Sequence, residues 1–202
     1  MLYNFLISLV DQFSALNVFR YLTFRTGLAV MSSLLIVFII GGPFIRFIQF
    51  HKITGPIRDD GPISHIVKKT GTPTMGGLLI LIGILFGTLL WADLKNSYVL
   101  ILLFVTTSFG LLGAIDDYVK IKRENSKGIS AWVKIISQIT LSLISVLLLL
   151  KFGNNDHLKN LYFPFLKSFS IHLGLFFIPF AIFIIVGSSN AVNLTDGLDG
   201  LA

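Results

Sequence analysis

The sequence predicts an all-α fold, a polytopic bundle of transmembrane helices. Hydrophobic residues make up 54% of the 202 residues and charged residues only 13%, about half the charged share of an ordinary soluble domain. The apolar residues also gather in runs of roughly 20, the length that crosses a hydrocarbon core about 30 Å thick. Together these two observations favour a membrane protein over a soluble domain with a large core.

Five runs are long and apolar enough to be predicted as spans. The predicted spans are Thr26–Phe47, Met75–Leu94, Ser97–Ile115, Ala131–Leu150 and Ile171–Val192. Ahead of them, apolar residues recur at helical spacing from Leu2 to Leu16 with polar residues between, which predicts an interfacial helix that lies on the membrane. Residues 1–202 are expected to form a single transmembrane domain.

The loops between the spans predict an orientation. Ten of the 16 Lys and Arg residues fall in the predicted loops 46–74, 116–134 and 193–202. Cytoplasmic loops are normally rich in Lys and Arg, so these loops are placed in the cytoplasm and the amino terminus outside. Membrane topology therefore explains the net charge of +6, and a nucleic-acid partner is not needed. Seven of the ten acids share these loops, and topology does not require them, so they indicate a site.

Asp116 and Asp117 follow the third predicted span directly. An ionised side chain costs about 2.5–3.5 kcal/mol at the centre of a membrane helix and less near the interface. Adjacent helical residues point about 100° apart, so one carboxylate can hold a cation while the other faces a reacting group. The chain has no cysteine, and oxygen ligands favour Mg²⁺ or Mn²⁺ over zinc. A helix end with solvated acids is the alternative.

The segment 189–200 carries a regular set of polar side chains. An amide or carboxylate stands at every third residue: Asn190, Asn193, Asp196 and Asp199. Steps of three drift about 60° backwards on a straight helix, so only neighbouring pairs share a face. A glycine follows each aspartate and lets backbone amides approach a ligand. A plain glycine-rich turn is the alternative, although it would not need four such side chains.

Two basic features suggest phosphate binding. Residues 61–77 combine Lys, Thr and Gly, whose ammonium, hydroxyl and amide groups suit phosphate, but they do not form a Walker motif. An ordinary basic loop beside the membrane is the alternative. Lys134 lies inside the start of the fourth predicted span, where an idle charge is disfavoured, so an acid or a phosphate is its expected partner. Most other lysines of this loop region are interpreted as topology determinants or contacts to anionic lipid.

Taken together, these strings resemble the phospho-N-acetylmuramoyl-pentapeptide-transferases, which catalyse the first membrane step of bacterial peptidoglycan synthesis. They belong to the polyprenyl-phosphate sugar-1-phosphate transferase superfamily. The resemblance covers nearly the whole chain from the first span onward. The matching strings are Ser64-His65, the run from Lys69 to Gly77, Asp116-Asp117-Tyr118 followed by Lys120, and the run from Asn190 to Gly200.

The resemblance implies a reaction. UDP-N-acetylmuramoyl-pentapeptide and undecaprenyl phosphate would give lipid I and UMP, with Mg²⁺, on the cytoplasmic face of the bacterial inner membrane. The catalytic residues implied are Asp116 and Asp117, with Asp117 also a metal ligand. The substrate-binding residues implied are Lys69, Thr74, Lys120, Lys134, Asn190, Asn193, Asp196 and Asp199. The expected partners are the two substrates and the lipid bilayer, without nucleic acid, and a homodimer is left open.

The resemblance also implies a longer enzyme. The family fold has about ten spans of bilayer length, with the main metal-binding Asp and a His-rich segment beyond residue 202. The chain is therefore expected to be the amino-terminal part of the enzyme and to be inactive alone. A channel or transporter would need charges along the span interiors, whereas here they gather at one membrane face. A sibling transferase with a UDP-N-acetylhexosamine donor stays open.

Overall fold

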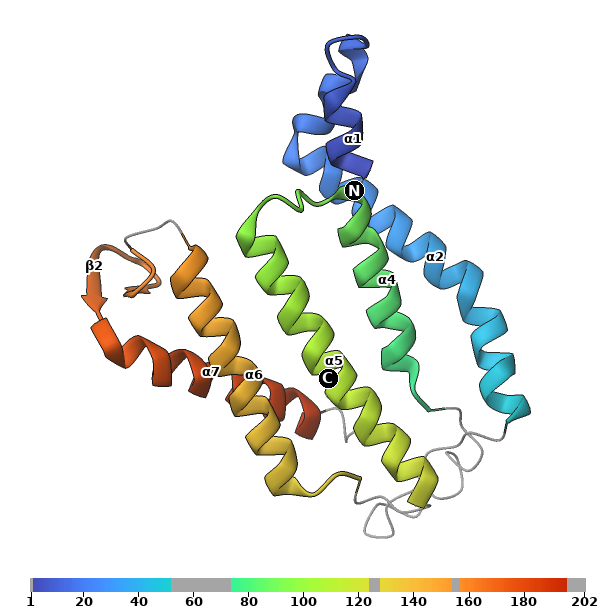
Figure 1. The fold of residues 1–202 in the computed structure, drawn as a ribbon, viewed down its shortest axis with the longest axis vertical. Coiled ribbons are helices and arrows are strands. Elements are labelled where there is room, and N and C mark those ends of the chain that lie inside the picture. The colour runs from blue at the N-terminus through green and yellow to red at the C-terminus, as the bar shows by residue number, and fades with distance from the viewer. Residues whose placement is uncertain (1, 52–73, 124–127, 154–156, 196–202) are drawn as a thin grey trace. The chain divides into compact units, whose positions relative to one another are not determined.

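The computed structural model describes residues 2–51, 74–123, 128–153 and 157–195. They form two compact units, residues 1–130 and residues 131–202. Helices dominate both units, as the hydropathy predicts (Figure 1).

The main helices of the first unit are α2 (Leu22–Phe50), α4 (Gly76–Trp91) and α5 (Ser97–Arg123). Consecutive helices run in opposite directions, and α4 packs against both α2 and α5 (Figure 1). The end of α2, the start of α4 and the end of α5 therefore lie at one end of the unit. The short turn from α4 to α5 lies at the other end.

The contact between α2 and α4 depends on small residues. A Cβ atom at Gly87 would lie 2.7 Å from the Ala29 carbonyl oxygen and would overlap Ser33 Oγ. Ser33 Oγ instead donates a hydrogen bond of 2.7 Å across the interface to the Gly83 carbonyl. Small residues that let helix backbones approach closely are typical of packing within membranes, where lipid removes the hydrophobic drive for association.

The amino-terminal residues form α1 (Leu2–Ser8) and the 3₁₀ helix η1 (Ser14–Arg20), where the sequence predicted one interfacial helix. Phe19 stacks on Trp91 with ring centroids 5.8 Å apart, and the Arg25 guanidinium lies 4.0 Å above the centre of the Tyr3 ring. These contacts hold the segment against α4 and α2. Phe13 remains 62% exposed, which suits a segment at the membrane–water interface.

The second unit contains α6 (Ala131–Phe152) and α7 (Phe177–Thr195), which pack against each other. Between them lie an antiparallel hairpin, β1 (Asn160–Phe163) and β2 (Leu166–His172), and a short 3₁₀ helix, η2 (Gly174–Phe176). The sequence did not predict the hairpin. Ile171, the predicted start of the fifth span, pairs with Leu161 in the sheet, so the helical span begins later.

The structure confirms a helical, multi-pass membrane protein. Four segments are long and apolar enough to cross a bilayer: Leu22–Phe50, Ser97–Arg123, Ala131–Phe152 and Gly174–Thr195. The second predicted span corresponds to α4, which is apolar but has only 16 residues. At 1.5 Å per residue, α4 is about 24 Å long, shorter than an average hydrocarbon core.

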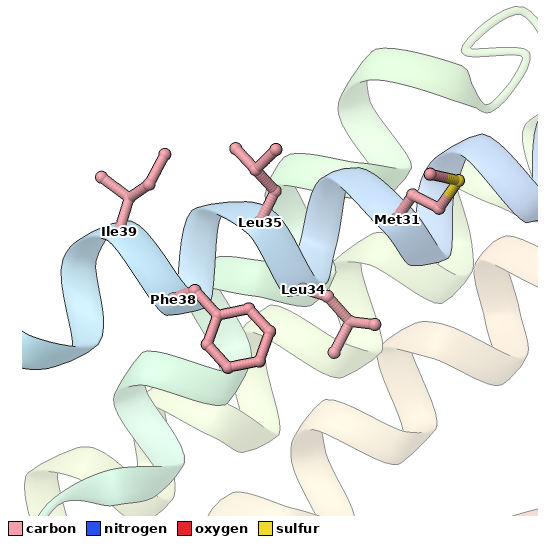
Figure 2. Close-up of a pocket in the computed structure, with 5 residues that line it drawn as sticks. All are labelled: Met31, Leu34, Leu35, Phe38 and Ile39. Atoms are coloured by element: carbon pink, nitrogen blue, oxygen red, sulfur yellow. The ribbon is translucent and has the colours of Figure 1, made fainter.

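The outer surface of α2 illustrates the lipid-facing character of these helices. Five apolar side chains project from this helix between Met31 and Ile39 (Figure 2). Phe38 is 80% exposed and Met31 is 68% exposed. A water-soluble protein rarely tolerates so large an apolar patch, whereas hydrocarbon chains solvate it readily.

Candidate active site

The last turns of α5 carry the predicted aspartate pair. Asp116 is buried, with 6% of its surface exposed. Lys120 Nζ lies 2.8 Å from Asp116 Oδ2 and 3.1 Å from Asp117 Oδ1. This triad forms because helical residues three and four apart are neighbours on the helix surface. One lysine is therefore shared by two adjacent carboxylates.

A second contact to Asp116 comes from the chain that follows α5. The backbone N–H of Ile129 donates a hydrogen bond of 2.8 Å to Asp116 Oδ1. The two carboxylate oxygens of Asp116 thus have different partners, one ammonium group and one amide. Such charge-assisted contacts are stronger than neutral hydrogen bonds and hold the carboxylate in place.

The two aspartates lie in different environments. The Asp117 side chain is 39% exposed, whereas Asp116 is buried. This difference follows from the angle between adjacent residues on a helix, as the sequence predicted. The triad carries two negative charges and one positive charge, so its net charge favours an approaching cation. Lys120 donates two of its three N–H groups to the aspartates, which leaves one for a ligand.

Thr74 precedes α4 by two residues, and the start of α4 lies at the same end of the first unit as the end of α5, which carries the triad (Figure 1). Thr74 is half-buried, and Met75 after it adopts a left-handed conformation with φ of 69°. The other predicted phosphate ligand of this region, Lys69, lies outside the described residues.

The second unit contains an amide pair, the buried Gln138 and the half-buried Asn190. Asn190 Nδ2 donates hydrogen bonds to Gln138 Oε1, at 2.8 Å, and to the Val186 carbonyl, at 2.9 Å. Gln138 Nε2 lies 3.4 Å from Ser189 Oγ and donates to it. Both N–H groups of the Asn190 side chain are therefore used within the protein, and its oxygen is the atom left to face a ligand.

Lys134 lies one turn before Gln138 on α6, and it is half-buried. The hydrogen bond between Gln138 and Asn190 brings the start of α6 to the end of α7. Lys134 and Asn193 therefore lie at the same end of this unit, and Asn193 is exposed. Asp196 and Asp199 lie outside the described residues.

Sequence reasoning missed Gln138. The signal was present, because Gln138, Ser142 and Ser145 follow one another at spacings of four and three residues in an apolar helix. All three are buried, so they form a polar stripe on the face of α6 that packs within the protein. A polar stripe in a membrane helix normally marks a helix contact or a binding site.

The described residues contain no group of three or more His, Cys, Asp or Glu side chains suited to hold a metal ion. Within the triad, the exposed carboxylate of Asp117 is open to a hard cation. Its oxygen atoms are of the type that Mg²⁺ prefers.

Comparison with known proteins gives two family matches. Residues 99–202 match glycosyl transferase family 4, and residues 69–81 match signature 1 of the phospho-N-acetylmuramoyl-pentapeptide-transferases. The family match includes the triad, Lys134 and the amide pair, whereas the signature begins at Lys69 and includes Thr74.

Three curated proteins with the name phospho-N-acetylmuramoyl-pentapeptide-transferase are similar along the whole chain. The Pelagibacter ubique protein is 61% identical over 202 residues, which is 100% of this chain and 56% of that protein. The Thermodesulfovibrio yellowstonii protein is 52% identical over 203 residues, with the same coverage of 100% and 56%. The Maricaulis maris protein is 45% identical over 208 residues, covering 100% and 57%.

The chain thus spans somewhat more than half the length of these relatives. The family match covers more than half of the chain, and both aspartates of the triad fall within it. The chain belongs to glycosyl transferase family 4, in the branch that carries the phospho-N-acetylmuramoyl-pentapeptide-transferase signature.

Proposed function

We propose that this chain serves the transfer of phospho-N-acetylmuramoyl-pentapeptide from UDP to undecaprenyl phosphate, giving lipid I and UMP. One observation supports this proposal most strongly. At the end of a membrane helix, the buried carboxylate of Asp116 lies beside the exposed carboxylate of Asp117, and Lys120 contacts both. The similar proteins that carry the transferase name support the choice of substrates.

The proposed chemistry is a phosphoryl transfer. An oxygen of the lipid phosphate forms a bond to the phosphorus that carries the sugar, while the bond from that phosphorus to the UMP oxygen breaks. The protein contributes mainly by positioning groups and by stabilising charge in such reactions. Asp116 is proposed to orient the lipid phosphate or to accept its proton, since its carboxylate is fixed by two partners.

The donor is a pyrophosphate and requires positive charge. Lys120 has one N–H group left after its two aspartate contacts, and Lys134 and Thr74 are proposed as further phosphate ligands. The resemblance assigns a similar role to Lys69. Asn190, through its free oxygen, and Asn193 are proposed to contact the nucleotide side, together with the aspartates that follow α7, Asp196 and Asp199.

Mg²⁺ is the proposed cofactor, and Asp117 is its proposed ligand within the described residues. The exposed carboxylate fits a cation that prefers oxygen and keeps part of its water shell. When bound, Mg²⁺ would offset the negative charge of the phosphate oxygens. The residues of the chain would still have to align the acceptor with the donor.

The proposed location is the inner membrane of a bacterium, with the triad on the cytoplasmic side and the amino terminus outside. This orientation follows from the ten basic residues in loops 46–74, 116–134 and 193–202 against six elsewhere. Reporter fusions after Lys127 should therefore read cytoplasmic and fusions after Asn155 external. The reverse pattern would contradict the assignment, because UDP-sugars are cytoplasmic.

The activity itself can be tested with two donors. A full-length protein that carries this sequence as its amino-terminal part is supplied with undecaprenyl phosphate, Mg²⁺ and either UDP-N-acetylmuramoyl-pentapeptide or UDP-N-acetylglucosamine. Formation of lipid I and release of UMP with the first donor alone are expected. Turnover with the second donor alone would instead assign the chain to a sibling transferase.

A further inference from the structure

We infer that the turn at Gly128 and Ile129 positions the Asp116 carboxylate, and that Gly128 is a positioning residue for the proposed transfer. This inference rests on the proposed function, because it gives the turn a role only through Asp116. Both residues follow α5 within the first unit.

The turn holds one oxygen of the carboxylate and α5 holds the other. Ile129 N–H donates to Asp116 Oδ1 at 2.8 Å, and Lys120 Nζ lies 2.8 Å from Asp116 Oδ2. These two contacts come from different segments, so rotation of the carboxylate about its Cβ–Cγ bond would break at least one of them. The Asp116 side chain is also largely shielded from solvent, with 9% of its surface exposed. The plane of the carboxylate is therefore fixed before any substrate arrives.

Only glycine fits at position 128. The backbone there has φ of +59°, a left-handed conformation that L residues with a side chain rarely adopt. A Cβ atom would overlap Asp116 Oδ1, and it would lie 2.9 Å from Lys120 Cε. Any side chain would therefore push directly on the carboxylate and on the lysine that pairs with it.

Two substitutions at Gly128 separate the effect of space from the effect of backbone strain. Gly128→Ala introduces both the overlap and the strain. Gly128→Asn introduces the same Cβ atom, but Asn tolerates the left-handed conformation better than other residues do. If space against Asp116 is what matters, both variants should lose activity. If strain alone matters, Gly128→Asn should remain close to wild type.

Gly113 on α5 offers a matched control. A Cβ atom there would meet nothing within 4 Å. Gly113→Ala therefore adds the same methyl group, on α5 one turn before Asp116, without touching the carboxylate.

The test measures kcat and both substrate KM values of the protein under the conditions of the two-donor assay. Gly128→Ala and Gly128→Asn should lower kcat by roughly 100-fold, the order expected when a reacting group is displaced by about 1 Å. Both KM values should stay within about threefold, because ground-state binding does not need the exact plane of the carboxylate. Gly113→Ala should keep wild-type kcat, and thermal unfolding should show that all variants are folded.

Three outcomes would overturn the inference. They are wild-type kcat in a folded Gly128→Asn variant, a rise in KM with unchanged kcat, and failure of both Gly128 variants to fold, which would make the turn purely structural. Asp116→Asn separates this failure from failure of the proposed function. Full activity of Asp116→Asn would contradict the proposed catalytic role of Asp116. An inactive Asp116→Asn variant together with active Gly128 variants would contradict only the positioning role of Gly128.

Discussion

The triad at the end of α5 and the amide pair between α6 and α7 are both clusters of polar side chains with one buried member, Asp116 or Gln138, yet their partners differ in kind. In the triad, a lysine and a backbone amide hold the charged Asp116. In the amide pair, Gln138 and Asn190 are neutral and bond to each other, while Gln138 also donates to Ser189 Oγ and Asn190 to the Val186 carbonyl.

The difference concerns what remains available to a ligand. The triad leaves an exposed carboxylate on Asp117 and one N–H group on Lys120. The amide pair uses both N–H groups of the Asn190 side chain inside the protein. The first cluster therefore leaves charged groups open to a ligand, whereas the second links two helices and leaves the Asn190 side-chain oxygen. Polar residues in membrane helices can serve either purpose, and their partners distinguish the two.

The largest effect is expected from removing charge in the triad. Asp116→Asn and Asp117→Asn keep the side-chain size, so folding should be spared while turnover falls by orders of magnitude. The assay is lipid I formation by the purified variants. More than about a tenth of the wild-type rate in both variants would end the catalytic assignment and with it the contrast between the clusters.

A smaller effect is expected at Lys134. If it contacts a phosphate, Lys134→Ala should raise the donor KM or lower kcat by an equivalent of roughly 2–4 kcal/mol, as for a desolvated charge-assisted contact. Lys122→Ala is the matched control, since Lys122 is an exposed lysine at the end of α5. Equal and small changes in both variants would leave Lys134 as a topology determinant.

The smallest effect is expected in the amide pair, on stability. A double-mutant cycle of Gln138→Ala and Asn190→Ala should give a coupling of about 0.6–1.7 kcal/mol, the range for hydrogen bonds between membrane helices. The measurement is unfolding in mixed detergent micelles. Gln138→Ala should retain most of the activity per folded molecule. A fall in kcat as large as that of the Asp116 variant would show that the pair belongs to the reacting site.

Hydropathy predicted most of the fold, because an apolar run of bilayer length has few alternatives to a helix. It misplaced the start of the fifth span, since Phe169 and Ile171 belong to a strand in which they alternate with Ser170 and His172. The alternation of apolar and polar residues covers only a few positions, and the apolar run of the helix follows it closely, so the strand was not recognised. The predicted second span also ran too far, since it included the charged Asp93, whereas α4 ends at Trp91.

The site could be predicted in part. The shared lysine of the triad follows from helical spacing, so the sequence alone contained the pattern Asp116, Asp117, Lys120. The Ile129 amide joins residues 13 positions apart through the backbone of a turn, and side-chain identity does not reveal such a contact. Lys69, Asp196 and Asp199 stay predictions, since they lie outside the described residues.

The short α4 has a consequence for the surrounding lipid. A helix of about 24 Å falls several ångströms short of an average hydrocarbon core, and a bilayer adapts to such a mismatch by thinning locally at a cost of fractions of a kcal/mol per Å. The start of α4 lies at the same end of its unit as the triad. Local thinning there would sink the headgroup layer toward Asp116. The phosphate of the proposed acceptor, undecaprenyl phosphate, would then reach the Asp116 carboxylate while it stays at the level of the other lipid headgroups.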